Sequence, residues 1–167
     1  HSIAEFFEHV LQRVDWSRDL HFQTNTTIDT LDYSGDGLNL GSKLIVAAVG
    51  PMQRSLGREV PGNLSLPEGF SEVRLSLPGV LVIQGKKYDS GTAGKKGDAD
   101  DIRDLAERLP SLLVDTFPLV VVVDDADFVT RNLRNWLWVT FTRSNPAADI
   151  QGVAAFTERK HWGCHSL

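Results

Sequence analysis

FPLVVVVDDAD, residues 117–127, is the stretch that decides the fold. After Pro118 it runs through five apolar residues, four of them valine, and then ends abruptly in carboxylates. A short, continuous apolar run of this kind predicts a strand that is buried on both faces, as in a parallel sheet. Ligands of open α/β sheets bind at the carboxyl ends of such strands. The carboxylates that follow are therefore candidate site residues, namely Asp124, Asp125 and Asp127.

The segments around this strand predict an α/β fold. Apolar residues at helical spacing predict helices over 3–14, 98–109 and 133–141. Apolar runs or alternation predict strands at 20–24, 44–49, 73–77, 80–84 and 151–156. Because strands and helices alternate, we expect a mainly parallel sheet flanked by helices, with the strands at 44–49, 80–84 and 119–123 in its centre. The strands at 20–24 and 151–156 are expected to pair within two related units.

Composition limits the kinds of partner. With 41% apolar and 23% charged residues, the 167-residue chain is an ordinary globular sequence, long enough for one sizeable core. Its net charge of -5, from 22 acidic and 17 basic residues, gives no footprint for nucleic acid or for an anionic membrane surface. No run approaches the ~20 apolar residues of a membrane span. Cys164 is the single cysteine, which excludes an internal disulfide framework and fits a reducing compartment, so we expect a cytoplasmic protein.

The two ends of the chain resemble each other. An offset of 130 residues places the apolar helix positions over 3–11 on those over 133–141, apolar on apolar. The same offset places Asp19 on Asp149, each directly before an apolar residue that begins a predicted strand. Catalysis would not need the same acid twice. We therefore interpret each as a partly buried structural brace that accepts backbone N–H groups in its turn, or pairs with the arginine six residues earlier.

This repeat suggests how the chain is organised. We predict a single α/β domain over residues 1–167, with related strand-helix-strand units at about 1–50 and 117–167 and a connecting segment at 51–116. The first unit would lack its opening strand and the second its end. The chain has no initiator methionine and opens directly on a helix start with the spacing of a capping box. We therefore expect a fragment of a longer protein.

Further residues suggest ligand or partner contacts. His161, Cys164 and His165 are of metal-ligand types, but without a second pair at a distance they form only a weak zinc pattern, and a packed turn explains them better. The glycine- and lysine-rich stretch 85–97 lacks the Walker spacing, so we interpret it as a solvated loop. The acidic turn leaves two alternatives: its carboxylates bind a divalent cation, or they cap and brace the next helix. Trp138 lies off the apolar stripe of its helix and is a candidate contact for another domain.

The second unit resembles a known family. A valine-rich strand ending in Asp-Asp-x-Asp, a tryptophan-bearing helix and then Thr-Arg-x-x-Pro-x-x-Asp stand here at 120–127, Trp136 and 142–149. This succession resembles the C-terminal domain of the UbiD-type decarboxylases. A duplicated C-terminal unit is itself a feature of the longer members of that family.

The first unit adds a second likeness. Asp29-x-Leu31-Asp32-Tyr33, followed by Gly-Ser-Lys-Leu at 41–44, is similar to the aspartate-containing segment of the family and its Gly-Ser-Lys turn. This likeness makes three residues candidates for a loop on the substrate side, namely Asp32, Ser42 and Lys43.

The resemblance implies a non-oxidative decarboxylase, or reversible carboxylase, of aromatic or α,β-unsaturated carboxylic acids. Its cofactors would be prenylated FMN and a divalent metal, held with the catalytic residues in an N-terminal flavin-binding part of the same protein. Their motifs are missing here, so we expect no catalytic or cofactor-binding residue and no bound cofactor in this chain. The chain would instead serve as a lid and contribute to the contacts of a homo-oligomer, in ubiquinone or menaquinone biosynthesis or aromatic acid metabolism. The alternative is a self-contained regulatory or binding module with a divalent cation at 124–127.

Overall fold

The computed structural model describes the chain except for residues 1, 28–36, 38–39, 63, 88–97 and 110. The helices are α1 (Ile3–Arg13), α2 (Asp98–Arg108), α3 (Ser111–Thr116), α4 (Ala126–Thr130), α5 (Leu133–Thr142) and α6 (Pro146–Asp149). The strands are β1 (Leu20–Thr26), β2 (Gly41–Val46), β3 (Ser71–Leu77), β4 (Val80–Gln84), β5 (Leu119–Val123), β6 (Phe156–Glu158) and β7 (His161–Gly163). The chain is therefore α/β, as predicted. No helix in this described part is long and apolar enough to cross a membrane.

The central sheet has the strand order β3-β4-β5. β4 and β5 are parallel neighbours, in a register that starts with Val80 opposite Leu119. This confirms the parallel pair predicted at 80–84 and 119–123. β3 is antiparallel to β4 and joins it through a tight turn at Gly79, whose φ of +79° favours glycine.

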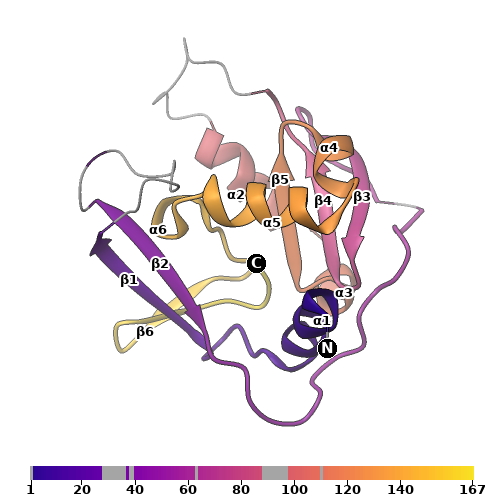
Figure 1. The fold of residues 1–167 in the computed structure, drawn as a ribbon. Coiled ribbons are helices and arrows are strands. Elements are labelled where there is room, and N and C mark those ends of the chain that lie inside the picture. The colour runs from indigo at the N-terminus through magenta and orange to yellow at the C-terminus, as the bar shows by residue number, and fades with distance from the viewer. Residues whose placement is uncertain (1, 28–36, 38–39, 63, 88–97, 110) are drawn as a thin grey trace.

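The core lies on both faces of this sheet, because alternate residues of β4 point to opposite sides. Val80 and Val82 are fully buried in the larger cluster, together with apolar residues of α1, α4 and α5. Leu81 is fully buried in a second cluster with Leu113 of α3 and with Phe117. Figure 1 shows α5 crossing in front of β4 and β5. The prediction of flanking helices is therefore confirmed for this sheet.

The sheet is mixed, which corrects the prediction of a mainly parallel sheet. Among the described strand pairs, β4–β5 alone is parallel. The strand predicted at 44–49 is β2, and it pairs antiparallel with β1 outside the central sheet. Its burial pattern gives the reason: Ser42 and Leu44 are covered while Lys43 and Ile45 are exposed. A strand covered on one face suits an antiparallel pair, whereas a central parallel strand is covered on both.

The strand predicted at 151–156 also needs correction. In this range Val153 makes one isolated antiparallel bridge, to Ser166, and β6 begins only at Phe156. Ala154 has a φ of +50°, a left-handed conformation that interrupts an extended backbone. The strand predicted at 20–24 forms as β1, and it pairs with β2 inside the first unit, as predicted.

The helix and turn of the predicted repeat are present in both units. After α1, Oδ2 of Asp19 accepts the N–H of Asp15 at 2.9 Å, and after α5, Oδ2 of Asp149 accepts the N–H of Asn145 at 2.6 Å. The backbone repeats as well, because the N–H of each aspartate donates to the carbonyl four residues earlier at 2.8 Å. This confirms that both aspartates brace their turns through backbone N–H groups. The strand after the turn forms only in the first unit, so two complete strand-helix-strand units are not seen in the described residues.

Candidate functional site

The acidic turn after β5 is used locally. Asp125 is the N-cap of α4, and its Oδ1 accepts the N–H of Phe128 at 2.8 Å. Asp127 accepts from Nε of Arg131 at 2.9 Å and lies 3.2 Å from Nη1 of Arg74 on β3. The hydrogen bond from Arg131 is the main cause that lowers the pKa of Asp127. The geometry therefore supports the capping and bracing alternative.

The same geometry gives no support to a cation-binding module. A divalent cation needs several oxygen ligands that converge on one point. Asp124 is exposed, Asp125 is committed to the helix cap, and Asp127 faces two guanidinium groups. Across the part of the chain that the structure describes, no group of three or more His, Cys, Asp or Glu side chains could hold a metal ion.

Ser42 connects the two related units. It is 8% exposed, its hydroxyl accepts the N–H of Ala147 at 2.8 Å, and it donates to Oδ1 of Asn145. Asn145 is the N-cap of α6 but makes no capping bond with its own side chain, so Ser42 satisfies this helix end from a distant strand. Lys43, the next residue of β2, is exposed on the opposite face. The structure thus separates these two candidates, and Asp32 lies outside the described residues.

The C-terminal candidates each have a different partner. Nε2 of His161 lies 2.8 Å from the carbonyl oxygen of Ser17, and Nε2 of His165 lies 2.9 Å from Oδ1 of Asp115. Cys164 is 2% exposed, and burial raises the pKa of its thiol to about 12. These three residues attach the C-terminal segment to the first turn and to α3, which supports the packed-turn interpretation.

A polar cleft of about 570 Å³ lies between the first turn, the 53–55 segment and the C-terminal residues. The side chains with ionisable groups in its lining are those of Asp15, Arg54, Asp115 and His165. The hydroxyl and N–H of Ser17 donate to Oδ1 of Asp15, and the bond from the hydroxyl is the main cause that lowers the pKa of Asp15. The side chains of His165 and Asp115 are 51% and 60% exposed, so water screens this pair.

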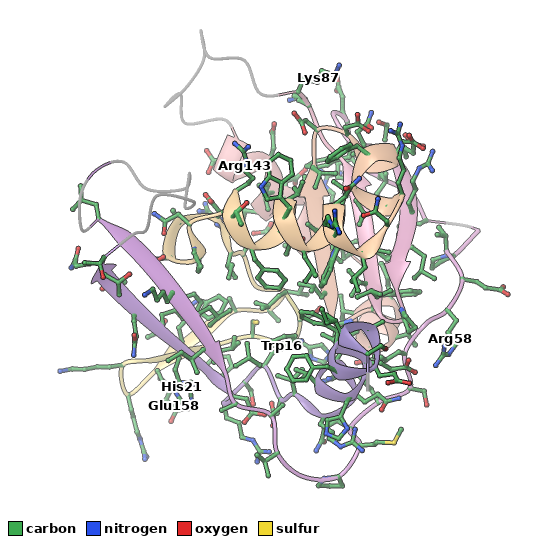
Figure 2. The ribbon with its side chains drawn as sticks, viewed as in Figure 1. Trp16, His21, Arg58, Lys87, Arg143 and Glu158 are labelled. Carbon is green, nitrogen blue, oxygen red and sulfur yellow. The ribbon has the colours of Figure 1, made fainter. Side chains whose placement is uncertain are left out.

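Sequence reasoning missed Arg54. Its Nη1 donates to the carbonyl oxygens of Leu11 at 2.8 Å and Val14 at 2.7 Å, at the end of α1. Burial is the main cause that lowers the pKa of Arg54, while Asp15 and Asp115 act in the opposite direction. Figure 2 shows Trp16, which also lines the cleft, inside the molecule beside α1, while Arg58 lies at the outer edge. Through Arg54, the connecting segment is therefore attached to the end of α1. No sequence motif indicates this contact.

Comparison with protein families bears on the first unit. Residues 1–48 match the family model described as the 3-octaprenyl-4-hydroxybenzoate carboxy-lyase C-terminal domain. The resemblance to the UbiD-type C-terminal domain is confirmed. The stretch that matches this family model contains α1, the turn that Asp19 closes, and the strands β1 and β2, including Ser42.

Curated relatives extend the likeness over most of the chain. A Chlamydia trachomatis protein described as "Uncharacterized protein" is 37% identical over 164 residues, which is 95% of this chain and 25% of the relative. A Chlamydia muridarum protein with the same description is 34% identical over 153 residues, 89% of this chain and 23% of the relative. A Chlamydia pneumoniae protein, named as a subunit of 4-hydroxybenzoate decarboxylase, is 29% identical over 146 residues, 87% of this chain and 22% of the relative. The chain thus spans about a quarter of the length of these curated relatives, and no solved structure matches it.

Proposed function

We propose that this chain is the C-terminal part of a non-oxidative decarboxylase, or reversible carboxylase, of aromatic or α,β-unsaturated carboxylic acids. The observation that carries the proposal is the match of residues 1–48 to a carboxy-lyase C-terminal domain. The Chlamydia pneumoniae relative, named as a 4-hydroxybenzoate decarboxylase subunit, supports the same class of reaction. The reaction would take place in the cytoplasm, in a homo-oligomeric enzyme.

Within that enzyme the chain acts as a lid and interface element and has no activity alone. The contacts of its candidate site residues support this role. Arg54 binds backbone carbonyls, Asp127 pairs with two arginines, and Ser42 caps a distant helix. Cys164 has a buried thiol whose raised pKa keeps it protonated near neutral pH, so it is not an activated nucleophile.

Prenylated FMN and a divalent metal would be held by the N-terminal flavin-binding part of the same protein. When bound, prenylated FMN supplies the electron sink for the electrons left behind as CO2 departs. The described residues of this chain do not fit either group. In the cleft, Arg54 already donates to two carbonyls and two carboxylates oppose a flavin phosphate, and the described side chains form no group of three metal ligands. No step of the reaction is therefore assigned to them.

The test compares the full-length protein with the 167-residue chain. Each is produced together with a source of prenylated FMN, and cofactor loading is checked by the absorbance spectrum. The first measurement is CO2 release from a panel of aromatic and unsaturated acids, beginning with 4-hydroxybenzoate. The second is the exchange of labelled bicarbonate into the same acids. We expect turnover or exchange by the full-length protein and none by the chain alone. A loaded full-length protein that neither decarboxylates nor exchanges any acid contradicts the proposed reaction, and activity of the chain alone contradicts the proposed role.

A further inference from the structure

The outer sides of α1 and α5 carry large apolar side chains that we call the aromatic face. It consists of Ile3 and Phe6 on α1, and of Trp138 and Phe141 on α5. Their exposed fractions are 54%, 59%, 44% and 56%. Single exposed apolar residues are normal on a protein surface, but several on neighbouring helices mark an interaction site.

Ring contacts make this face continuous between the two helices. Phe7 stacks on Phe141 with a centroid distance of 5.8 Å, and it meets Phe6 edge-on at 5.5 Å. Trp138 precedes Phe141 by three residues and therefore lies on the same side of α5. Figure 1 shows both helices on the side of the molecule that faces the viewer. The ring contacts thus join Phe6 to Phe141, and Trp138, which packs edge-on against Phe128 of α4 at 6.3 Å, extends the face along α5.

Basic groups border the aromatic face on α5, whereas the acidic Glu5 lies beside Phe6 on α1. The guanidinium of Arg143 lies 4.7 Å from the centroid of the Trp138 ring, and Figure 2 shows Arg143 beside α5. Arg134, one turn before Trp138, is exposed. A partner that complements this surface presents apolar side chains in its middle and acidic groups opposite the α5 edge.

We propose that the aromatic face docks on the remaining part of the same polypeptide, the part that the curated relatives possess and this chain does not span. This inference rests on the proposed function, in which this chain is the C-terminal part of a longer protein. The chain accounts for 25% of the Chlamydia trachomatis relative and 22% of the Chlamydia pneumoniae one, so most of such a protein is available as the occupant.

The size of the face favours an occupant in the same polypeptide over a second copy. α1 and α5 have 11 and 10 residues. Helices of this length are about 15 Å long and about 10 Å wide, so two of them offer on the order of 300 Å². A stable dimer buries about 800 Å² per partner, whereas contacts between domains of one chain begin at about 600 Å² for both sides together. A covalent link also supplies an effective concentration of about millimolar, so a small face suffices.

Hydroxyl-radical footprinting of the full-length protein tests the docking without measuring activity. Phe156 on β6 is the internal control, because it is 41% exposed and lies away from α1 and α5 (Figure 1). The oxidation rate of each residue is divided by its rate in the unfolded protein. We expect the normalised rates of Phe6, Trp138 and Phe141 to be about fivefold below that of Phe156, because a docked surface excludes water. Equal rates would overturn the proposal.

Dilution and a matched pair of variants identify the occupant. Protection by the same polypeptide persists when the protein is diluted about a hundredfold, whereas loss of protection together with dissociation to monomers would show a second copy instead and overturn the proposal. Phe6→Ser is expected to raise the oxidation of Trp138 and Phe141, and Phe156→Ser to leave it unchanged. Where Phe6→Ser does not fold, the footprint of the unmodified protein decides alone.

Failure of the docking and failure of the proposed reaction are separate outcomes. A protected aromatic face in a loaded but inactive full-length protein supports docking and contradicts the carboxy-lyase proposal. An active enzyme whose aromatic face reacts like Phe156 contradicts docking alone.

Discussion

Removing the carboxylate of Asp19 should destabilise the fold more than removing that of Asp149, although both close the same kind of turn. Each Oδ2 accepts the N–H of the residue four positions earlier, at 2.9 and 2.6 Å. The two sites differ in burial, because Asp19 is 8% exposed while Asp149 is exposed. Water replaces a hydrogen bond lost at the exposed Asp149, but the carboxylate of Asp19 is buried, so the partly buried N–H that loses it keeps more of its desolvation penalty.

The magnitude follows from that difference. A hydrogen bond to a charged group in a buried site contributes about 2 kcal/mol, and we expect an exposed one to contribute about 0.5 kcal/mol. For a chain of this length 1 kcal/mol shifts the melting temperature by about 2–4 °C. Asp19→Ala should therefore lower it by about 4–8 °C and Asp149→Ala by about 1–2 °C.

Differential scanning calorimetry of the 167-residue chain measures both variants beside Asp19→Asn and Asp149→Asn. The asparagine oxygen still accepts the N–H, so Asp19→Asn should recover at least half of the loss seen with alanine. Equal losses for the two alanine variants, or a larger one at Asp149, would refute the argument that burial sets the contribution of the shared hydrogen bond.

Three other variants or reactions test separate contacts. Ser42→Ala should lower the melting temperature by about 3–6 °C, because it removes the hydroxyl that caps α6 and pairs with Asn145, whereas the neighbouring Lys43→Ala on the exposed face should leave it unchanged. The pKa of Asp15 is lowered in the folded state, so its stabilising effect is full above its ordinary pKa of about 4 and is lost as the pH falls through the lowered value. Melting curves of Asp15→Asn and the unmodified chain should therefore differ at about pH 6 and converge as the pH falls below the lowered pKa. Because burial raises the pKa of the Cys164 thiol to about 12, iodoacetamide at about pH 8 should alkylate it at least about a hundredfold more slowly than in the unfolded chain. Comparable rates would show that the site opens readily.

The sequence predicts the elements whose patterns are local. The valine run of β5 and the apolar run of β4 identify parallel neighbours. The burial on both faces that the valine run predicts is found in β4, whereas β5, at the edge of the described sheet, is half-buried from Leu119 to Val122. The helical spacing over 133–141 corresponds to α5, in which Trp136 is fully buried and Trp138 is 44% exposed, as its place off the apolar stripe indicated. In both cases the residues of the segment itself are enough to predict the element.

The errors concern features that depend on distant residues. The apolar run at 44–49 suggested a central strand, but which faces of β2 are covered is decided by β1 and α6. The acid at 149 was expected to be partly buried like its counterpart, and only the packing around each turn leaves Asp149 exposed and Asp19 buried. Arg54 illustrates the same limit, because its role as a cap of α1 exists only once the connecting segment returns to that helix.

The two turns are each completed by a segment of the other unit. At the second turn, Ser42 of β2 accepts the N–H of Ala147 from a position 105 residues away. At the first turn, the N–H of Cys164 donates to the carbonyl oxygen of Trp16 at 3.2 Å. The 130-residue offset reveals that the turns are related, but an offset aligns residues that are alike and does not show which residues touch.

The approach of the C-terminal segment to the first turn is close enough to restrict the sequence there. A Cβ at Gly163 would lie 2.6 Å from the carbonyl oxygen of Ser17, which is backbone and cannot rotate away. The same carbonyl lies 2.8 Å from Nε2 of His161, so β7 meets this turn through two residues of one strand. Each turn keeps the hydrogen bonds of its own aspartate, but because the first unit completes the second turn and the second unit completes the first, neither unit makes all the contacts of its turn without the other. The repeat is therefore local in sequence, while the stability of each copy depends on both.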